Sequence, residues 1–264
     1  MKRKLGIESS CLPGVPETEA LAKFKAAGFE TFFTGYSSME QVTALRKKAD
    51  ELGLIYDFIH APFGNINSLW TPGLDYLEIY NKIIGSIDAA AANGIPTVVV
   101  HVSSGWWPPQ ISDIGLARFD SIVAYAAGKN VNIAFENIRK LGNIACLMER
   151  YERVANVGFC FDNGHEYCYL ETVKFLDLFG KRTLCTHIHD NNGRDKKDPW
   201  LDMDSHLLPF DGSYDFADMM MRLNTYGYQG SLTLEVTKKG EYKAMSDEDW
   251  LALCYDKIKK ISEM

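Results

Sequence analysis

The chain has 264 residues, of which 46% are hydrophobic and 24% charged, and its formal net charge is −7. This length matches the roughly 250 residues of one α/β barrel, and the hydrophobic share is enough for a sizeable core. The acidic balance argues against a nucleic-acid partner, because phosphate backbones are bound mainly by Lys and Arg. Six cysteines without a CxxC pair also argue against a disulfide framework.

The first four residues, Met1-Lys2-Arg3-Lys4, form a basic segment, and an expected strand follows at once. The sequence contains no apolar targeting stretch and no apolar run of about 18 residues that could span a membrane. We therefore expect a cytoplasmic protein with no membrane partner.

Short apolar runs alternate with longer amphipathic segments along the chain. The apolar runs predict strands over Leu5–Glu8, Glu30–Phe33, Ile55–His60, Thr97–His101, Asn132–Glu136, Val157–Asp162, Leu184–His189 and Ser231–Glu235. The amphipathic segments predict helices from Pro16 to a stop at Gly28, from Ser38 to Gly53, and over Leu74–Asn93, Ile114–Gly128, Gly142–Tyr151, Val173–Gly180, Asp215–Tyr226 and Asp247–Met264. Most strands lack polar alternation, which is typical of strands covered on both faces.

Eight strand-helix units over 264 residues average 33 residues each, and their alternation indicates a parallel sheet. We expect the sheet to close into one (β/α)8 TIM barrel, a single domain over residues 1–264. The alternative is an open doubly wound sheet, which would require a glycine-rich phosphate turn after the first strand. That turn reads Glu8-Ser9-Ser10-Cys11-Leu12-Pro13-Gly14 and lacks the required spacing.

Histidines and carboxylates gather at the expected strand ends, which a barrel brings to one rim. The third to eighth strands supply His60, His101, Glu136, Asp162, His187 and Glu235, His165 follows closely, and the loop after the seventh strand adds Asp204 and His206. Each residue alone has an ordinary explanation, such as a core histidine or a helix cap. Together they indicate a site for a divalent cation.

Three carboxylates and one imidazole, from Glu136, Asp162, His187 and Glu235, suit Zn²⁺, Mn²⁺, Co²⁺ or Fe²⁺ better than Ca²⁺. Such a metal can bind two adjacent sugar oxygens and stabilise an enediolate, with Glu136 and Glu235 on either side as an acid/base pair. The other five groups could bind one or two further metal ions or hydrogen-bond to sugar hydroxyls.

The motifs at these strand ends resemble those of the xylose isomerase-like TIM-barrel superfamily, which contains sugar phosphate isomerases and epimerases together with endonuclease IV. The resemblance covers essentially the whole chain and rests on His60-Ala61-Pro62-Phe63-Gly64-Asn65-Ile66-Asn67, Phe135-Glu136-Asn137, Phe161-Asp162-Asn163-Gly164-His165, His187-Ile188-His189-Asp190-Asn191 and Asp204-Ser205-His206-Leu207-Leu208-Pro209-Phe210-Asp211-Gly212. The joint pattern is specific to the superfamily and much less specific to one reaction.

The resemblance implies two alternative sites. In the sugar epimerases four ligands, here Glu136, Asp162, His187 and Glu235, hold one metal, and a histidine matching His165 contacts the substrate. A second glutamate that those epimerases often carry is missing from Ile138-Arg139-Lys140-Leu141-Gly142. In endonuclease IV-like enzymes nine ligands hold three zinc ions, and all nine residue types are matched by His60, His101, Glu136, Asp162, His165, His187, Asp204, His206 and Glu235.

The acidic balance and the tryptophan-bearing loops favour a small carbohydrate substrate. We expect Trp107 to stack on the sugar, Arg194 or Lys140 to bind a phosphate, and His60 and His101 to contact hydroxyls if they bind no metal. The leading interpretation is a sugar or sugar-phosphate isomerase or epimerase with one to three divalent ions. The alternatives are a multi-zinc phosphodiester hydrolase, a polyol dehydratase or lyase, and a non-catalytic sugar-binding barrel.

Oligomeric state is left open by the sequence. The apolar stretch Met219-Met220-Met221 fits either a core segment or the interface of a homo-oligomer.

Overall fold

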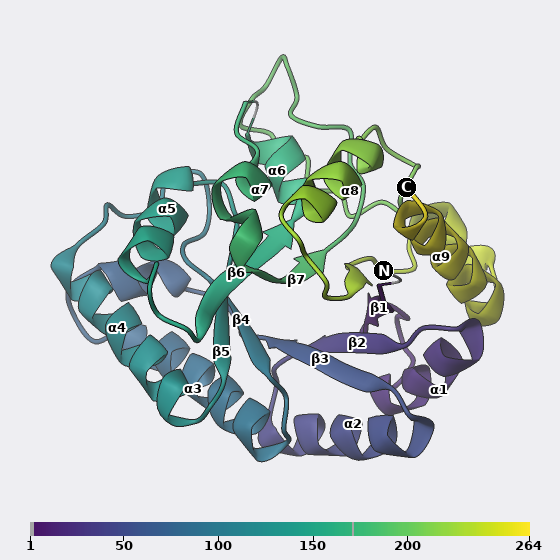
Figure 1. The fold of residues 1–264 in the computed structure, drawn as a ribbon, viewed down its shortest axis with the longest axis horizontal. Helices are drawn as coiled ribbons and strands as arrows, with labels where there is room; N and C mark the ends of the chain where they lie inside the picture. Colours follow the sequence, from purple (N-terminus) through teal and green to yellow (C-terminus); the bar gives the residue numbers. More distant parts are fainter. Residues whose placement is uncertain (1–2, 171) are drawn as a thin grey trace.

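The eight strands of the described residues form one parallel sheet surrounded by helices in the computed structural model, which describes residues 3–170 and 172–264 (Figure 1). In chain order they are β1 (Leu5–Glu8), β2 (Thr31–Gly35), β3 (Ile55–His60), β4 (Thr97–His101), β5 (Asn132–Glu136), β6 (Val157–Asp162), β7 (Thr183–His187) and β8 (Leu232–Leu234). Their order in the sheet is β7-β6-β5-β4-β3-β2-β1-β8. Strands β1 and β3 to β6 have the predicted bounds, whereas β2 and β7 are shifted by one or two residues and β8 is shorter.

The α-helices are α1 (Glu17–Ala27), α2 (Met39–Leu52), α3 (Tyr76–Ala92), α4 (Asp113–Gly128), α5 (Leu141–Arg150), α6 (Asn163–Tyr169), α7 (Phe175–Phe179), α8 (Phe216–Thr225) and α9 (Asp247–Ser262). Short 3₁₀ turns lie at η1 (Ile66–Trp70), η2 (Gly180–Arg182) and η3 (Gly240–Ala244). Helix α6 was not predicted, because Asp162-Asn163-Gly164 is typical of a turn. Asp162 instead caps this helix, and its carboxylate accepts a hydrogen bond from the His165 amide at 2.6 Å.

The barrel closes between β7 and β8 just beyond the regular strands. Ile188 forms a parallel bridge with Leu234; the Ile188 amide donates to the Thr233 carbonyl at 2.8 Å, and the Glu235 amide donates to the Ile188 carbonyl at 3.0 Å. Strand β1 pairs with both β2 and β8. The predicted (β/α)8 barrel is therefore confirmed, and every strand points its carboxyl end to the same rim.

Two apolar layers hold the barrel together. The interior is filled by a cluster of buried side chains, Phe33, Phe58, Val99, Ala134, Cys160 and Cys185. A larger cluster lies between the strands and the outer helices, as expected for strands that are covered on both faces. All six cysteines are free, which agrees with the absence of a disulfide framework.

The loop after β3 is anchored against the loop after β4. The indole Nε1 of Trp70 donates to the carbonyl of Val102 at 2.7 Å, and the indole ring packs on Gly115 in α4. Arg118, also in α4, donates to the carbonyls of Ser68, Leu69 and Thr71 at 2.7 to 2.9 Å. These contacts fix the backbone that leads to Ser103 and Ser104 at the rim.

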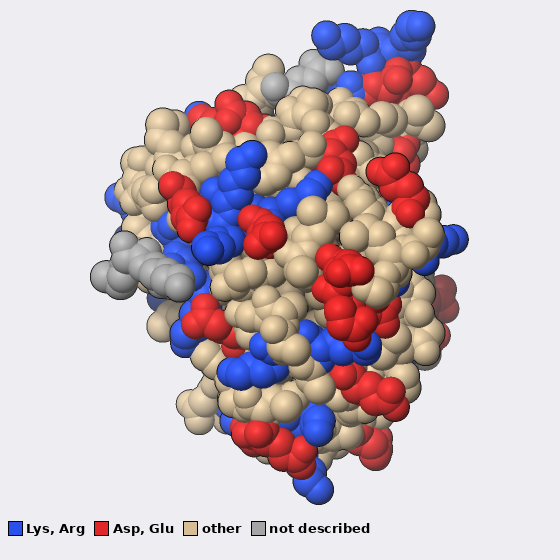
Figure 2. All heavy atoms as spheres, turned by 90° about the vertical axis from the view of Figure 1, so that its right-hand side faces the viewer, with Lys and Arg blue, Asp and Glu red and all other residues tan. Residues whose placement is uncertain are grey.

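The outer surface carries charges of both signs. On the face shown in Figure 2, acidic and basic side chains are intermingled in small groups. Within residues 3–170 and 172–264, no helix is both long enough and apolar enough to cross a membrane. Met219 and Met220 are buried in the core, while Met221 is 55% exposed, so most of this apolar stretch is structural.

Substituting Gly115 with alanine should destabilise the fold, because its Cβ would lie 2.2 Å from Cε3 of Trp70. We expect Gly115→Ala to lower the free energy of unfolding by about 1–3 kcal/mol, the usual range for overpacking a core. Gly128→Ala, at the end of the same helix, is the matched control, since a Cβ there meets nothing within 4 Å. Urea denaturation of both variants measures the difference, and equal stabilities would contradict the packing described here.

Candidate metal centre

Five strands and the residue after β8 present imidazoles and carboxylates to one point on the rim. His60 ends β3, His101 ends β4, Glu136 ends β5, Asp162 ends β6, His187 ends β7, and Glu235 follows β8. The strand register places His101 beside Glu136 and Asp162 beside His187. Closure of the parallel barrel therefore brings together side chains that lie far apart in the sequence.

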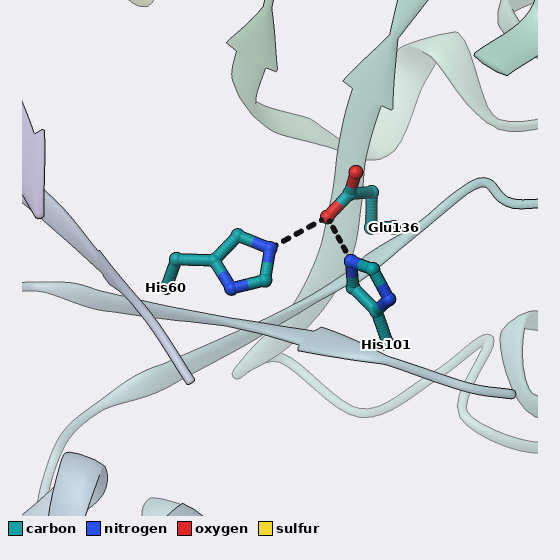
Figure 3. Close-up of side chains that lie close together, drawn as sticks. All are labelled: His60, His101 and Glu136. Carbon is teal, nitrogen blue, oxygen red and sulfur yellow. Dashed lines mark hydrogen bonds and ion pairs between the residues drawn. The ribbon is translucent and has the colours of Figure 1, made fainter. Parts of the chain in front are cut away.

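Glu136 lies at the centre of this group and is only 1% exposed. Its Oε2 lies 3.0 Å from Nε2 of His60 and 3.1 Å from Nε2 of His101. Figure 3 shows both rings turned toward this carboxylate oxygen of Glu136. Its Oε1 lies 3.2 Å from Nδ1 of His165 and 3.3 Å from Nδ1 of His187. One carboxylate thus faces four imidazole rings.

A second carboxylate, Asp204, is brought in by the long loop that projects beyond the helices after β7 (Figure 1). Its Oδ2 lies 3.1 Å from Nε2 of His165 and 3.2 Å from Nε2 of His206. The backbone of His206 has a φ of 42°, a left-handed conformation that is rare for a residue other than glycine. Such conformations concentrate at functional sites, where the surrounding structure holds them.

The donor atoms fall into several overlapping groups in which all atoms lie within 4.8 Å of one another. These groups are His60 with His101 and Glu136, Glu136 with Asp162 and His165, Asp162 with His187 and Glu235, Glu136 with Cys160 and His187, and His189 with His206 and Glu235. Spacing of this kind allows one cation to contact several ligands at about 2.0–2.3 Å. Glu136 belongs to three of these groups.

The hydrogen bonds of three histidines indicate that a cation or a proton lies between each imidazole Nε2 and the carboxylate oxygen that faces it. The Nδ1 atoms of His60, His165 and His206 each contact a backbone carbonyl oxygen, at 2.8, 2.8 and 3.0 Å. Because a carbonyl oxygen can only accept, each Nδ1 must carry the proton, and a neutral ring then presents a lone pair at Nε2. That lone pair faces a carboxylate oxygen, so either a proton or a metal ion must lie between them.

The unpaired ring of His187 gives a second, independent indication that the site fits a cation. Among the described residues neither of its ring nitrogens has a hydrogen-bond partner, although the ring is fully buried. Its Nδ1 lies 3.5 Å from Oε2 of Glu235 and 3.9 Å from Oδ2 of Asp162. Buried polar atoms are normally satisfied, and a cation coordinated by the imidazole and both carboxylates would satisfy Nδ1.

The electrostatics of the metal-free cluster agree with this geometry. Burial alone would raise the pKa of Glu136, but the charges of His101 and His187 outweigh it and hold the pKa well below that of an ordinary glutamate. Burial would lower the pKa of His187, but the charges of Glu235 and Glu136 raise it to about 10. For His206, burial is likewise outweighed by the hydrogen bond to Asp204, and the pKa rises to about 10. The carboxylates thus favour positive charge on the neighbouring imidazoles.

Buried side-chain amides fix the backbone that carries the ligands. Asn137 accepts from the amide of Asp162 at 2.8 Å and donates to its carbonyl at 2.7 Å. Asn163 makes the same pair of hydrogen bonds with the backbone of His189, at 3.0 and 2.8 Å. Such outer contacts set the orientation of metal ligands.

The loop that brings in Asp204 and His206 is held at its return by Asp190. The Asp190 carboxylate accepts hydrogen bonds from the backbone amides of Phe210, Gly212 and Tyr214 at 2.9 to 3.1 Å. These hydrogen bonds, together with the antiparallel bridge between Asp190 and Leu207, hold the loop over the rim.

His189 belongs to the cluster, although it was not among the residues predicted for the site. Its Nε2 lies 3.3 Å from the carboxylate oxygens of Asp162, and its ring stacks on that of His206 with centroids 3.9 Å apart. The spacing of His187-Ile188-His189 could have indicated this position, because alternate residues of a strand point to the same side and His189 therefore follows His187.

A cavity of about 320 Å³ opens beside these groups. The ligand residues that line it are His60, His101, Glu136, His165, Asp204, His206 and Glu235. Arg194 and Trp107 are not among the lining residues, and Trp107 is 75% exposed beside Trp200. Arg139 and Tyr169, which the sequence did not single out for substrate binding, do line the cavity.

A family model described as "Xylose isomerase-like TIM barrel" matches residues 19–254. The chain belongs to the xylose isomerase-like TIM-barrel family. The resemblance inferred from the motifs is thereby confirmed. One fold can host many reactions, so membership alone leaves the reaction open.

Two curated proteins are similar in sequence. "Uncharacterized protein y4fM" of Sinorhizobium fredii is 32% identical over 163 residues, which is 56% of this chain and 50% of that protein. The match therefore spans about half the length of that relative. "Uncharacterized protein MJ1311" of Methanocaldococcus jannaschii is 25% identical over 256 residues, or 88% of this chain and 83% of that protein.

Several solved structures share the fold. A xylose isomerase domain protein from Planctomyces limnophilus has a TM-score of 0.76 at 18% identity, and 100% of this chain and 99% of that chain are covered. A D-tagatose 3-epimerase-like protein has a TM-score of 0.75 at 20% identity, with 98% and 97% covered. D-allulose 3-epimerase from Methylomonas sp., in complex with D-allulose, has a TM-score of 0.75 at 16% identity, with 99% and 97% covered.

Loading the metal-free protein with Zn²⁺ near neutral pH should release protons. His187 and His206, whose pKa values are raised to about 10, are protonated there and must become neutral to bind a cation. The apparent Zn²⁺ affinity should therefore rise as the pH increases toward 10. Calorimetric titration in buffers of different ionisation enthalpy measures the proton count. His206→Asn should release fewer protons, and zinc binding without proton release would contradict this account.

Proposed function

We propose that the protein is a divalent-metal-dependent enzyme that isomerises or epimerises a small sugar or sugar phosphate. The observation that carries this proposal is the convergence of Glu136, Asp162, His187 and Glu235 beside a cavity of about 320 Å³. A cavity of this size suits a small polar ligand. The fold shared with a D-tagatose 3-epimerase-like protein and a D-allulose 3-epimerase supports the same class of substrate.

The donor set fits a cation such as Mn²⁺, Zn²⁺, Co²⁺ or Fe²⁺, since three carboxylates and one imidazole form a mixed oxygen and nitrogen site. Glu136, Asp162, His187 and Glu235 would hold it. Bound there, the cation would polarise substrate oxygens and stabilise the negative charge that develops when a proton leaves carbon.

We assign the proton transfers to Glu136 and Glu235. The side chain of Glu235 is 17% exposed, against 1% for Glu136, and both line the cavity. This exposure to the cavity supports assigning removal of the proton from the substrate carbon to Glu235. Glu136 is kept ionised by the surrounding imidazoles and can accept the proton of an adjacent hydroxyl. His165 also lines the cavity and can hydrogen-bond to a sugar oxygen.

Glu235→Gln and Glu136→Gln should each abolish exchange of substrate hydrogen with solvent, because a carboxamide cannot take up a proton at neutral pH. NMR detection of deuterium uptake from D₂O into a panel of ketoses and ketose phosphates measures this exchange. We expect at least about a hundredfold loss, the usual contribution of a general acid or base.

Two controls separate proton transfer from metal loss. Glu241→Gln, an exposed carboxylate beside the neighbouring groove, should exchange at the wild-type rate. The metal content of each variant must also be measured, because Glu136 and Glu235 are candidate ligands. Exchange that persists in metal-loaded Glu235→Gln would rule out its role as the base.

A second candidate, an endonuclease IV-like phosphodiester hydrolase, is favoured by one specific observation. His60 and His101 share Oε2 of Glu136, and His165 and His206 share Oδ2 of Asp204, so ligands beyond the first four are also gathered in sets. Two or three cations at this spacing can stabilise both the attacking and the leaving oxygen of a phosphodiester. The acidic net charge of −7 argues against a nucleic-acid substrate for such an activity.

Elemental analysis of the purified protein separates the two candidates. About one metal ion per chain is expected for the isomerase or epimerase, and about three zinc ions for the hydrolase. Incubation of the metal-loaded protein with an abasic-site duplex at low salt then tests the hydrolase directly. Cleavage of that duplex would overturn the preferred function, and an intact duplex removes DNA repair from consideration.

A further inference from the structure

We propose that Arg139 binds an anionic group of the substrate, so that the cavity accepts a sugar phosphate or a sugar acid rather than a neutral sugar. This inference rests on the proposed function and adds the charge of the substrate to it. Arg139 follows β5 by three residues and lines the same cavity as Glu136 and Glu235.

One edge of the Arg139 guanidinium is only partly hydrogen-bonded. Its Nη2 is paired with Oδ2 of Asp202, whereas its buried Nε has no partner among residues 3–170 and 172–264. Nε and Nη2 form the fork with which arginine grips two oxygens of one carboxylate or phosphate. One half of this fork is thus unused, although buried donors are normally satisfied.

Ser103 supplies a second unsatisfied donor in the same cavity wall. It lies just beyond β4, is fully buried, and its Oγ has no hydrogen-bond partner within the described part of the chain. The backbone beside it is fixed, because Asn67 accepts from the Ser104 amide and donates to the Ser104 carbonyl, both at 2.9 Å. Two unpaired donors therefore belong to residues that line the cavity.

Aromatic rings hold the guanidinium in place. Its central carbon lies 4.1 Å from the ring centroid of Tyr169 and 5.4 Å from that of Trp106. These contacts keep the planar group oriented and reduce the entropy lost when it binds an anion. An arginine that is stacked and oriented in this way is suited to bind two oxygens of a carboxylate or phosphate with its planar fork.

Asp202 acts as the internal substitute for the substrate's anion. Its side chain is 59% exposed, while that of Arg139 is 18% exposed, so the carboxylate can turn to solvent at little cost. Tyr169 donates to the other Asp202 oxygen at 2.9 Å, which holds the carboxylate in position until it is displaced. A phosphate or carboxylate on the substrate would replace one hydrogen bond with two.

Calorimetric titration of the zinc-loaded protein with inorganic phosphate tests this assignment. Arg139→Gln should weaken phosphate binding about tenfold or more, because a hydrogen bond to a charged group is lost. Asp202→Asn should tighten it about two- to fivefold, because a competing exposed carboxylate is removed. Arg139→Lys should bind with intermediate affinity, since it keeps the charge without the fork.

Matched controls are Asp198→Asn, in the same loop as Asp202, and the exposed Arg153→Gln, both of which should bind phosphate as the wild type does. Repeating the titrations with acetate distinguishes the source of the anion: tighter phosphate binding assigns a sugar phosphate, and tighter acetate binding assigns a sugar acid. Wild-type affinity in Arg139→Gln, or equal affinities in Asp202→Asn and Asp198→Asn, would overturn the proposal. If Arg139→Gln does not fold, the comparison of phosphate binding between Asp202→Asn and Asp198→Asn still tests the proposal.

Different measurements would contradict the role of Arg139 and the proposed function. Phosphate binding is measured without turnover, so loss of the Arg139 effect would leave isomerisation of a neutral sugar intact. A protein that takes up no metal would contradict the proposed function, whatever anion Arg139 binds.

Discussion

The burial of one carboxylate among four imidazoles is the constraint on which this structure depends. Glu136 is 1% exposed, and an ionised group removed from water costs on the order of several kcal/mol unless positive charge compensates it. His60, His101, His165 and His187 lie 3.0 to 3.3 Å from its oxygens and can supply that charge as protons or as ligands to cations. The Asn137 and Asp190 hydrogen bonds hold the neighbouring backbone around this group.

The barrel brings the candidate ligands together, and its loops form the wall of the cavity. Closure through Ile188 and Leu234 brings the strand ends together regardless of the substrate. The cavity wall, in contrast, comes from loops: Ser103 follows β4, Arg139 follows β5, and Asp202 belongs to the long loop after β7. This division agrees with the general behaviour of α/β barrels, in which one scaffold carries many chemistries by loop variation.

Much of the scaffold was predictable from the sequence, because strands buried on both faces leave continuous apolar runs. The ends of β3 to β6 were predicted to the residue, and with them the positions of His60, His101, Glu136 and Asp162. Loop geometry was not predictable in the same way. The course of the loop after β7 depends on hydrogen bonds from backbone amides to the Asp190 carboxylate and on the left-handed backbone of His206. Neither feature has a local sequence signature. For that reason Arg194 and Trp107 were expected at the cavity, where Arg139 and Tyr169 lie instead.

Anomalous X-ray diffraction from crystals of the zinc-loaded protein, recorded on both sides of the zinc absorption edge, tests the central claim most directly. The account predicts a strong anomalous peak about 2.0–2.2 Å from a carboxylate oxygen of Glu136, with His187 and Glu235 in the same coordination shell. Peaks confined to surface residues, with none near Glu136, would contradict it.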